Sequence, residues 1–189
     1  GVPDSLFGAA WPAIYKDLGV PMSWASYISV IIAVGTIISS LNAAKVAQRF
    51  GTYKVTLVST ALTAASILGF AFSRRFIFLV LCSLPVGFGA GAIDAVLNNY
   101  VALHYKASHM NFMQCCYGIG VSVSPYLMSL ALSKVSSWNR GYLLAFGFQM
   151  SIVIVVLLSM PLWKKVIWYS FQIWIQQSLI HTVRFQHFL

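Results

Sequence analysis

The sequence predicts an all-α membrane protein, a six-helix transmembrane bundle, from three observations. Of the 189 residues, 59% are hydrophobic and only 8% are charged, whereas soluble domains carry roughly 25% charged residues. The apolar residues form long runs between short polar breaks, and a helix needs about 20 mostly apolar residues to cross a bilayer. The chain holds only three acidic residues, too few for a water-facing surface.

One partial and five complete apolar runs follow one another along the chain. The partial run comes first, over residues 1–15, and we expect it to be a truncated first helix. The complete runs cover residues 24–44, 55–72, 76–105, 112–132 and 142–163. The run over residues 76–105 is long enough to tilt or to protrude from the bilayer.

Polar breaks connect these runs. They lie at residues 16–23, 45–54, 73–75, 106–111 and 133–141. Connections this short predict antiparallel neighbours, so alternate breaks lie on opposite sides of the membrane. Counted in this way, one side carries six Lys and Arg and the other carries five, a difference too small to orient the bundle.

The net charge of +9 raises the question of a nucleic-acid partner. The basic residues are spread between apolar runs instead of forming a patch, which argues against nucleic acid. Basic residues beside apolar spans are typical of contact with lipid headgroups. We therefore expect the lipid bilayer as the partner of this surface.

The segment 166–189 differs in character from the six-helix part, residues 1–165. It contains four Gln and two His, too many polar residues for a membrane span. Its residues Trp168, Phe171, Ile175 and Leu179 share one helical face. An interfacial helix and an end that does not belong to the native fold are equally compatible with this pattern.

No motif of covalent chemistry occurs in the sequence. Cys82, Cys115 and Cys116 lie in apolar runs without CxxC or Cys/His spacing, so neither a disulfide framework nor a zinc site is indicated. Neither HExxH nor a phosphate-binding GxxxxGK[ST] loop is present. We expect no metal, no cofactor and no enzymatic activity.

Asp94 is the most informative residue, because it lies inside an apolar run. An ionised side chain there costs at least about 2.5–3.5 kcal/mol, and a carboxyl group in an apolar setting suits proton uptake and release. Gly87, Gly91, Asp94 and Asn98 are four, three and four residues apart, so they share one helical face that should avoid lipid. The alternative is a structural hydrogen bond to a neighbouring helix.

The first helix repeats this spacing with Asp4, Gly8, Trp11 and Tyr15. A carboxyl group beside two aromatic side chains with polar atoms is suited to a hydroxylated ligand. We therefore expect Trp11 and Tyr15 to bind substrate and Asp4 to carry protons. A structural hydrogen bond for Asp4 and an interfacial anchor for Tyr15 are the alternatives.

The fifth helix presents a third polar face. Gln114, Gly118, Ser122 and Pro125 form a stripe of small or polar residues. Three helices with one polar face each predict a central cavity that water can enter. Gln114 and Asn98 are the amides expected to bind substrate there.

The segment 44–54 resembles the loop signature of the major facilitator superfamily. That signature combines two glycines, an acid and several basic residues. Arg49, Gly51 and Lys54 match it, whereas Ala44 stands for the first Gly and Gln48 for the acid. The resemblance implies a gating loop formed by the matching residues, on the cytoplasmic side.

The run from Gly87 to Val101, which reads GxGxGxxDxxxNxYV, resembles the fourth helix of the fucose:proton symporter-like group of that family. An acid at the position of Asp94 belongs to the proton pathway of the group, and its first helix also has an acid, which Asp4 could match. Gln114 stands where a His is frequent.

The resemblance covers residues 1–165. It implies the amino-terminal half of a twelve-helix major facilitator fold, with a carboxyl-terminal half as its missing partner. We expect a multi-pass protein of the cell (plasma) membrane that transports a small polar solute, such as a sugar, together with protons. An uncoupled facilitator or efflux transporter and a non-functional fragment are the alternatives.

Overall fold

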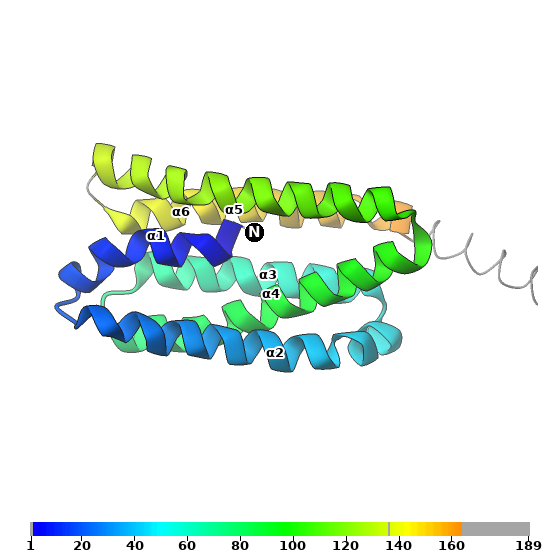
Figure 1. Cartoon of the computed structure of the whole chain (residues 1–189), viewed down its shortest axis with the longest axis horizontal. Coiled ribbons are helices and arrows are strands. Elements are labelled where there is room, and N and C mark those ends of the chain that lie inside the picture. The colour runs from blue at the N-terminus through cyan, green and yellow to red at the C-terminus, as the bar shows by residue number, and fades with distance from the viewer. Residues whose placement is uncertain (1, 136, 164–189) are drawn as a thin grey trace, which may run out of the picture. The chain divides into compact units, whose positions relative to one another are not determined.

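The computed structural model describes residues 2–135 and 137–163, and in these ranges every regular element is a helix. The elements are α1 (Val2–Asp17), the short 3₁₀ helix η1 (Met22–Trp24), α2 (Ala25–Phe50), α3 (Thr52–Phe72), α4 (Phe76–His104), α5 (Ala107–Val135) and α6 (Trp138–Leu158). Figure 1 shows the long helices running side by side in alternating directions. The predicted six-helix order is confirmed.

Five of these helices are long and apolar enough to cross a membrane, and α1, with 16 residues, is shorter. Large apolar side chains of α2 lie open on the surface, with Val30 59%, Ile37 59% and Leu41 75% exposed. Such a surface suits hydrocarbon and not water. The chain is therefore an integral, multi-pass membrane protein.

The helices extend beyond the apolar runs. The expected connection at residues 45–54 is wrong, because α2 continues to Phe50 and α3 begins at Thr52. Apolar runs mark only the hydrocarbon-spanning part of a helix, and Lys and Arg side chains reach toward the headgroups from the turns beyond it.

Gly51 alone joins α2 to α3. Its φ of +87° lies in a region that favours glycine. Its N–H donates to the carbonyl oxygen of Ala47 at 2.8 Å, and its own carbonyl oxygen accepts from the N–H of Val55 at 3.2 Å. The same residue thus ends one helix and starts the next.

The chain divides into two compact units, Gly1–Ile154 and Val155–Leu189. In the second unit the described residues end at Trp163, whose indole N–H donates to the Ser159 hydroxyl at 3.0 Å. The predicted segment 166–189 lies outside the described residues.

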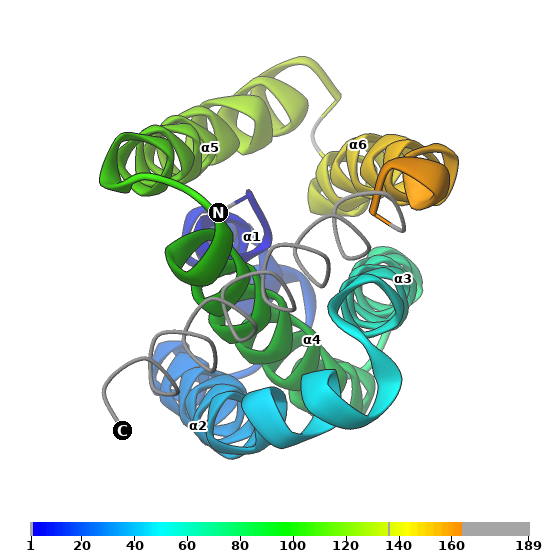
Figure 2. The ribbon, with the colours of Figure 1, turned by 90° about the vertical axis from the view of Figure 1, so that its right-hand side faces the viewer.

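Within the first unit α4 is the central helix, since it packs against both α2 and α3, while α1 packs against α5. Figure 2 shows α4 passing between α2 and α3 with α1 and α5 beyond it. The largest buried cluster gathers Leu6, Ile14, Ile28, Phe70, Leu79 and Met128 among others. The apolar core therefore lies where α1 and α2 meet the other helices.

Hydroxyl groups of α2 bond to the backbone of α4. Ser39 donates to the carbonyl oxygen of Phe88 at 2.6 Å, Thr36 donates to that of Gly87 at 3.2 Å, and Ser40 donates to that of Gly91 at 3.2 Å. We call these contacts the α2–α4 seam. Glycines on α4 let the two backbones approach this closely.

Candidate functional site

Three predicted site residues form a continuous hydrogen-bonded chain. Asn98 Nδ2 donates to Asp94 Oδ1 at 3.1 Å, one turn apart on α4. Gln114 Nε2, from α5, donates to Asn98 Oδ1 at 3.1 Å. The structure therefore brings together the polar faces that the sequence predicted separately for the fourth and fifth helices.

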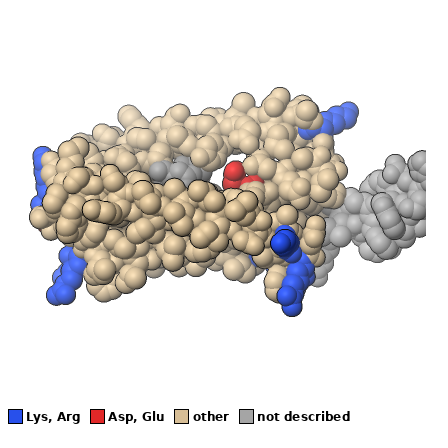
Figure 3. All heavy atoms as spheres, turned by 60° about the horizontal axis from the view of Figure 1, so that its bottom comes forward, with Lys and Arg blue, Asp and Glu red and all other residues tan. Residues whose placement is uncertain are grey.

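The side chains at the two ends of this hydrogen-bonded series are exposed. Asp94 and Gln114 are exposed and Asn98 is half-buried. Figure 3 shows red acidic atoms inside a hollow of the surface, whereas the blue Lys and Arg side chains lie toward the ends of the molecule. Acids within membrane spans usually face the interior of the bundle or a cavity that water can enter.

The glycines on the Asp94 face have a different role. A Cβ atom at Gly91 would lie 2.5 Å from the carbonyl oxygen of Thr36 and 2.9 Å from its Cα atom. A Cβ at Gly87 would collide with the carbonyl oxygen of Ile32. The shared face thus serves packing against α2 at Gly87 and Gly91, and it carries the Asn98 side chain that bonds to Gln114 on α5.

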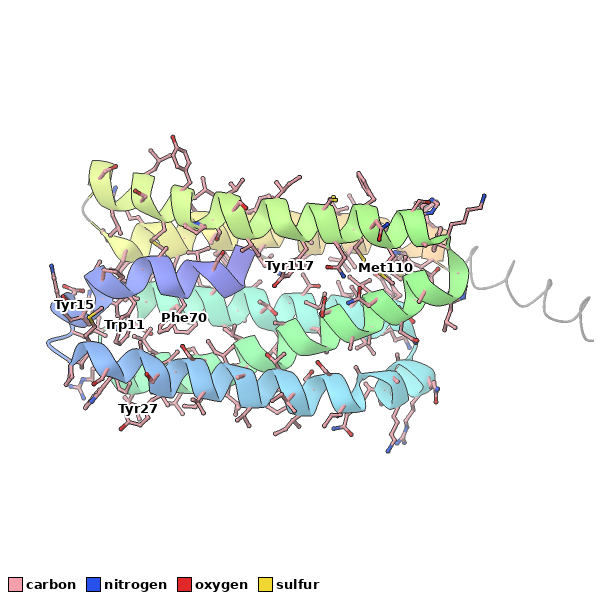
Figure 4. The ribbon with its side chains drawn as sticks, in the orientation of Figure 1. Trp11, Tyr15, Tyr27, Phe70, Met110 and Tyr117 are labelled. Atoms are coloured by element: carbon pink, nitrogen blue, oxygen red, sulfur yellow. The ribbon has the colours of Figure 1, made fainter. Side chains whose placement is uncertain are left out.

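Figure 4 shows Met110 and Tyr117 projecting from the side of α5 that is turned toward α4. Gln114 lies between them at spacings of four and three residues, so it belongs to the same face. The hydrogen bond to Asn98 agrees with this placement.

The carboxyl group of Asp94 is the natural proton acceptor of the three. Among the described residues its hydrogen-bond partner is the amide of Asn98. A carboxylate offers only acceptors, whereas an amide offers two N–H donors and one oxygen. The site can therefore bind a proton at one end and exchange hydrogen bonds with a solute at the other.

Trp11 and Tyr15, the predicted substrate-binding residues of α1, do not join the Gln114–Asn98–Asp94 series. Trp11 is 4% exposed and its indole N–H donates to the carbonyl oxygen of Met22 at 2.9 Å, so it is a packing residue in this structure. Tyr15 is half-buried against the core, with the Lys16 Nζ 5.9 Å from its ring centre. Figure 4 shows both aromatic residues at the end of α1 that leads to α2, away from Met110.

Asp4 lies in the first turn of α1, and its side chain is outside the described part. Its assignment as a second proton carrier stays a prediction.

The residues predicted to form a gating loop belong largely to helices. Arg49 is in the last turn of α2 with its guanidinium 5.6 Å from the Phe50 ring centre. Lys54 is exposed in the first turn of α3, and Gly51 is the joint between them. The gating role of these residues stays a prediction.

Two sets of interhelical hydrogen bonds were not predicted from the sequence. Thr36, Ser39 and Ser40 form the α2 side of the seam, and their spacing of three and four residues in an apolar run was the available signal. Asp17 accepts a hydrogen bond from the indole N–H of the buried Trp138 at 2.9 Å. The two residues are 121 positions apart in the sequence, so no local sequence pattern predicts this bond.

Metal ligands do not gather in the part of the chain that is described. No group of three or more His, Cys, Asp or Glu is close enough there to hold an ion. Cys115 and Cys116 are exposed on α5 and Cys82 is half-buried in α4. The described residues therefore offer polar side chains for a solute and no set of metal ligands.

Comparisons with known proteins agree with the helical architecture. The family model described as the Major Facilitator Superfamily matches residues 1–169. The chain is 24% identical over 159 residues to Bypass of stop codon protein 6 of Saccharomyces cerevisiae, covering 82% of this chain and 32% of that protein. It is 22% identical over 175 residues to Synaptic vesicle glycoprotein 2C of Rattus norvegicus, covering 90% of this chain and 24% of that protein. The chain thus spans about a third and about a quarter of the lengths of these two relatives.

Proposed function

The chain belongs to the Major Facilitator Superfamily, a family of transporters, and we propose that it forms half of a secondary transporter that couples a small polar solute to protons through Asp94. The six helices correspond to one half of the twelve-helix fold, and alternating access arises when one half rocks against the other. The second half is the partner that completes the solute pathway.

The observation that supports this proposal is the hydrogen-bonded chain Gln114–Asn98–Asp94, which links α5 to an intramembrane acid on α4. A carboxyl group inside a span costs several kcal/mol, so it needs a compensating role. The exposure of the Asp94 side chain favours proton exchange over a purely structural bond.

A sugar or a similar polyhydroxylated compound is the proposed solute. Two amides and a carboxyl group provide donors and acceptors within reach of hydroxyl groups. The likeness of α4 to the fucose:proton symporter-like group supports the same choice, and it favours the plasma membrane as the location.

The test replaces Asp94 with Asn in the full-length chain, reconstituted in lipid vesicles. Asn keeps the size and the hydrogen-bonding capacity of the side chain but cannot exchange a proton. With a panel of labelled neutral sugars, we expect Asp94→Asn to lose accumulation driven by a pH gradient and to retain exchange of solute across the membrane. Asp17→Asn, the same substitution far from the hollow, should keep both.

The outcomes separate the candidate functions. Full gradient-driven accumulation by Asp94→Asn would show that Asp94 is not the proton carrier. Solute uptake that ignores the pH gradient in the unsubstituted protein would identify an uncoupled facilitator or an efflux transporter.

A further inference from the structure

We propose that Asp94, Asn98 and Gln114 form a hydrogen-bond relay whose direction reverses when Asp94 binds a proton, so that Gln114 is the better hydrogen-bond acceptor for the solute in the ionised state and the better donor in the proton-loaded state. The proposal rests on the proposed proton coupling at Asp94, and it specifies how the proton and the solute influence each other.

In the ionised state the direction of the relay is fixed by the carboxylate. Because a carboxylate only accepts hydrogen bonds, Asn98 turns its Nδ2 toward Asp94, and the donor–acceptor distance is 3.1 Å. The Asn98 Oδ1 then faces α5 and accepts from Gln114 Nε2, also at 3.1 Å. The amide oxygen of Gln114, Oε1, is the atom left to accept from a solute.

Protonation allows the opposite arrangement, because the carboxyl group gains an O–H donor that it lacks when ionised. One proton passes from a hydronium ion of the solvent to a carboxylate oxygen of Asp94, which becomes an O–H donor, and a water molecule is left behind. Asn98 turns its amide over and accepts this bond at Oδ1, so its Nδ2 now donates to Gln114 Oε1. The Gln114 Nε2 hydrogens are released toward the hollow. No other covalent bond changes, and each amide keeps both of its hydrogens.

The surroundings permit this rotation. Among the described residues, the side-chain amides of Asn98 and Gln114 make no hydrogen bonds apart from those of the relay. The terminal torsions of Asn and Gln are broad, and Gln114 is exposed while Asn98 is half-buried. Reversal therefore exchanges two hydrogen bonds for two others without breaking further contacts.

Other titratable groups lie on the adjoining stretches of the packed helices. They are Lys45 on α2, Tyr53 and Lys54 on α3, Tyr100 and His104 on α4, Tyr105 and Lys106 in the connection after it, His109, Cys115, Cys116 and Tyr117 on α5, and Asp4 on α1. Among the described side chains, the Asp94 carboxylate is hydrogen-bonded to Asn98 and to none of these groups. The charge state of Asp94 thus reaches α5 through Asn98.

The relay defines the chemistry of the solute. In the ionised state Gln114 Oε1 is free and one Nε2 hydrogen is used by Asn98, whereas in the proton-loaded state Oε1 accepts from Asn98 and both Nε2 hydrogens are free. Protonation therefore shifts Gln114 from accepting toward donating. A hydroxyl group serves in both states. A deoxyfluoro analogue lacks the O–H donor, so it should lose more affinity in the ionised state than in the proton-loaded state.

The experiment observes the relay without any solute. Full-length chain with ¹⁵N-labelled glutamine is studied in lipid bilayers by solid-state NMR at alkaline and acid pH, and the Gln114 signal is identified by its loss in Gln114→Leu. The protonated carboxyl band of Asp94, identified by its loss in Asp94→Asn, is followed by infrared spectroscopy. We expect the Gln114 side-chain shift to change as that band appears.

The decisive variant is Asn98→Leu, with Asn99→Leu as the matched control, since Asn99 is exposed on α4 and outside the relay. Asn98→Leu should abolish the change at Gln114 while the Asp94 band still appears, and Asn99→Leu should preserve both. A Gln114 change that persists in Asn98→Leu, or that is absent from the unsubstituted protein while Asp94 becomes protonated, would overturn the relay. An Asp94 band that never appears would instead refute the proposed proton coupling itself.

A second experiment tests the solute chemistry by measuring the binding of neutral hexoses and of their deoxyfluoro analogues. The loss of affinity on fluorination should be larger at alkaline than at acid pH in the unsubstituted protein and equal at both in Asn98→Leu. An equal loss in the unsubstituted protein would contradict the assigned solute chemistry.

Discussion

Gly91 shows how a single residue decides whether two membrane helices can meet. Its missing side chain brings the α4 backbone against Thr36 of α2, where Ser40 donates to the Gly91 carbonyl oxygen at 3.2 Å. Asp94 follows three residues later on the same face and is hydrogen-bonded to Asn98 of the same helix, which in turn bonds to Gln114 of α5. On this face of α4, Gly91 therefore packs against α2, whereas Asp94 forms a hydrogen bond.

Gly91→Ala should destabilise the protein, because the added Cβ would lie 2.5 Å from the Thr36 carbonyl oxygen. Backbone atoms cannot yield as a flexible side chain can, so we expect a loss of about 1–3 kcal/mol, the usual cost of overpacking. The measurement is thermal unfolding of the full-length protein in detergent. Gly147→Ala is the control, since a Cβ there meets nothing within 4 Å, and equal stabilities of the two variants would refute the close contact.

The sequence predicted Asp94, Asn98 and Gln114 because each lies on a polar face of an otherwise apolar helix, and helical geometry alone defines such faces. It did not predict which residues of those faces meet. Trp11 also lies on a polar stripe, yet its ring is buried and its N–H is bound to the Met22 carbonyl oxygen. Periodicity identifies a face but not the neighbour that covers it.

At the scale of the helix, the α2–α4 seam combines glycines on one side with hydroxyl groups on the other. Hydrophobic burial gives little drive to association between helices in lipid, so close packing and hydrogen bonds hold them together. Ser39 makes the shortest of these bonds, 2.6 Å to the carbonyl oxygen of Phe88. The seam therefore fixes α2 against the helix that carries Asp94.

Ser39→Ala should weaken the seam modestly, by about 0.6 kcal/mol and at most about 1.7 kcal/mol, the average and the maximum found for hydrogen bonds between membrane helices. Resistance of the full-length protein to unfolding by denaturing detergent would measure the loss. Ser29→Ala is the matched control, because Ser29 is exposed on the same helix and outside the seam. A loss no larger than that of the control would mean that the Ser39 bond contributes nothing.

The order and type of the helices could be predicted because length and hydropathy define a membrane span. Their ends could not, since α2 continues through Lys45 and Arg49 to Phe50. A helix that leaves the hydrocarbon keeps its own backbone hydrogen bonds, and only the joint at Gly51 stops it. The apolar run therefore gives the position of a helix and underestimates its length.

At the scale of the whole molecule, the order of the spans fixes which ends lie on the same side of the membrane. Gln48 lies near the end of α2, and Ser137 precedes α6, so that α3, α4 and α5 separate the two positions. Three crossings place them on opposite sides. The resemblance of segment 44–54 to the family's loop signature predicts that Gln48 lies on the cytoplasmic side.

Single-cysteine labelling tests this arrangement in full-length protein whose native cysteines, Cys82, Cys115 and Cys116, have been replaced. A reagent that cannot cross the membrane should label a cysteine at 137 in intact cells and a cysteine at 48 only after permeabilisation. Labelling of both positions in intact cells would require a different number of spans between them.

The one-residue joint at Gly51 limits how α2 and α3 can be displaced. Consecutive Cα atoms are about 3.8 Å apart, so Phe50 and Thr52, two peptide units apart, can separate by no more than roughly 7.6 Å. Neither helix has slack to slide along the other, and both pack on α4. In the proposed transport cycle we therefore expect α2, α3 and α4 to move together, with Asp94 held in place on α4.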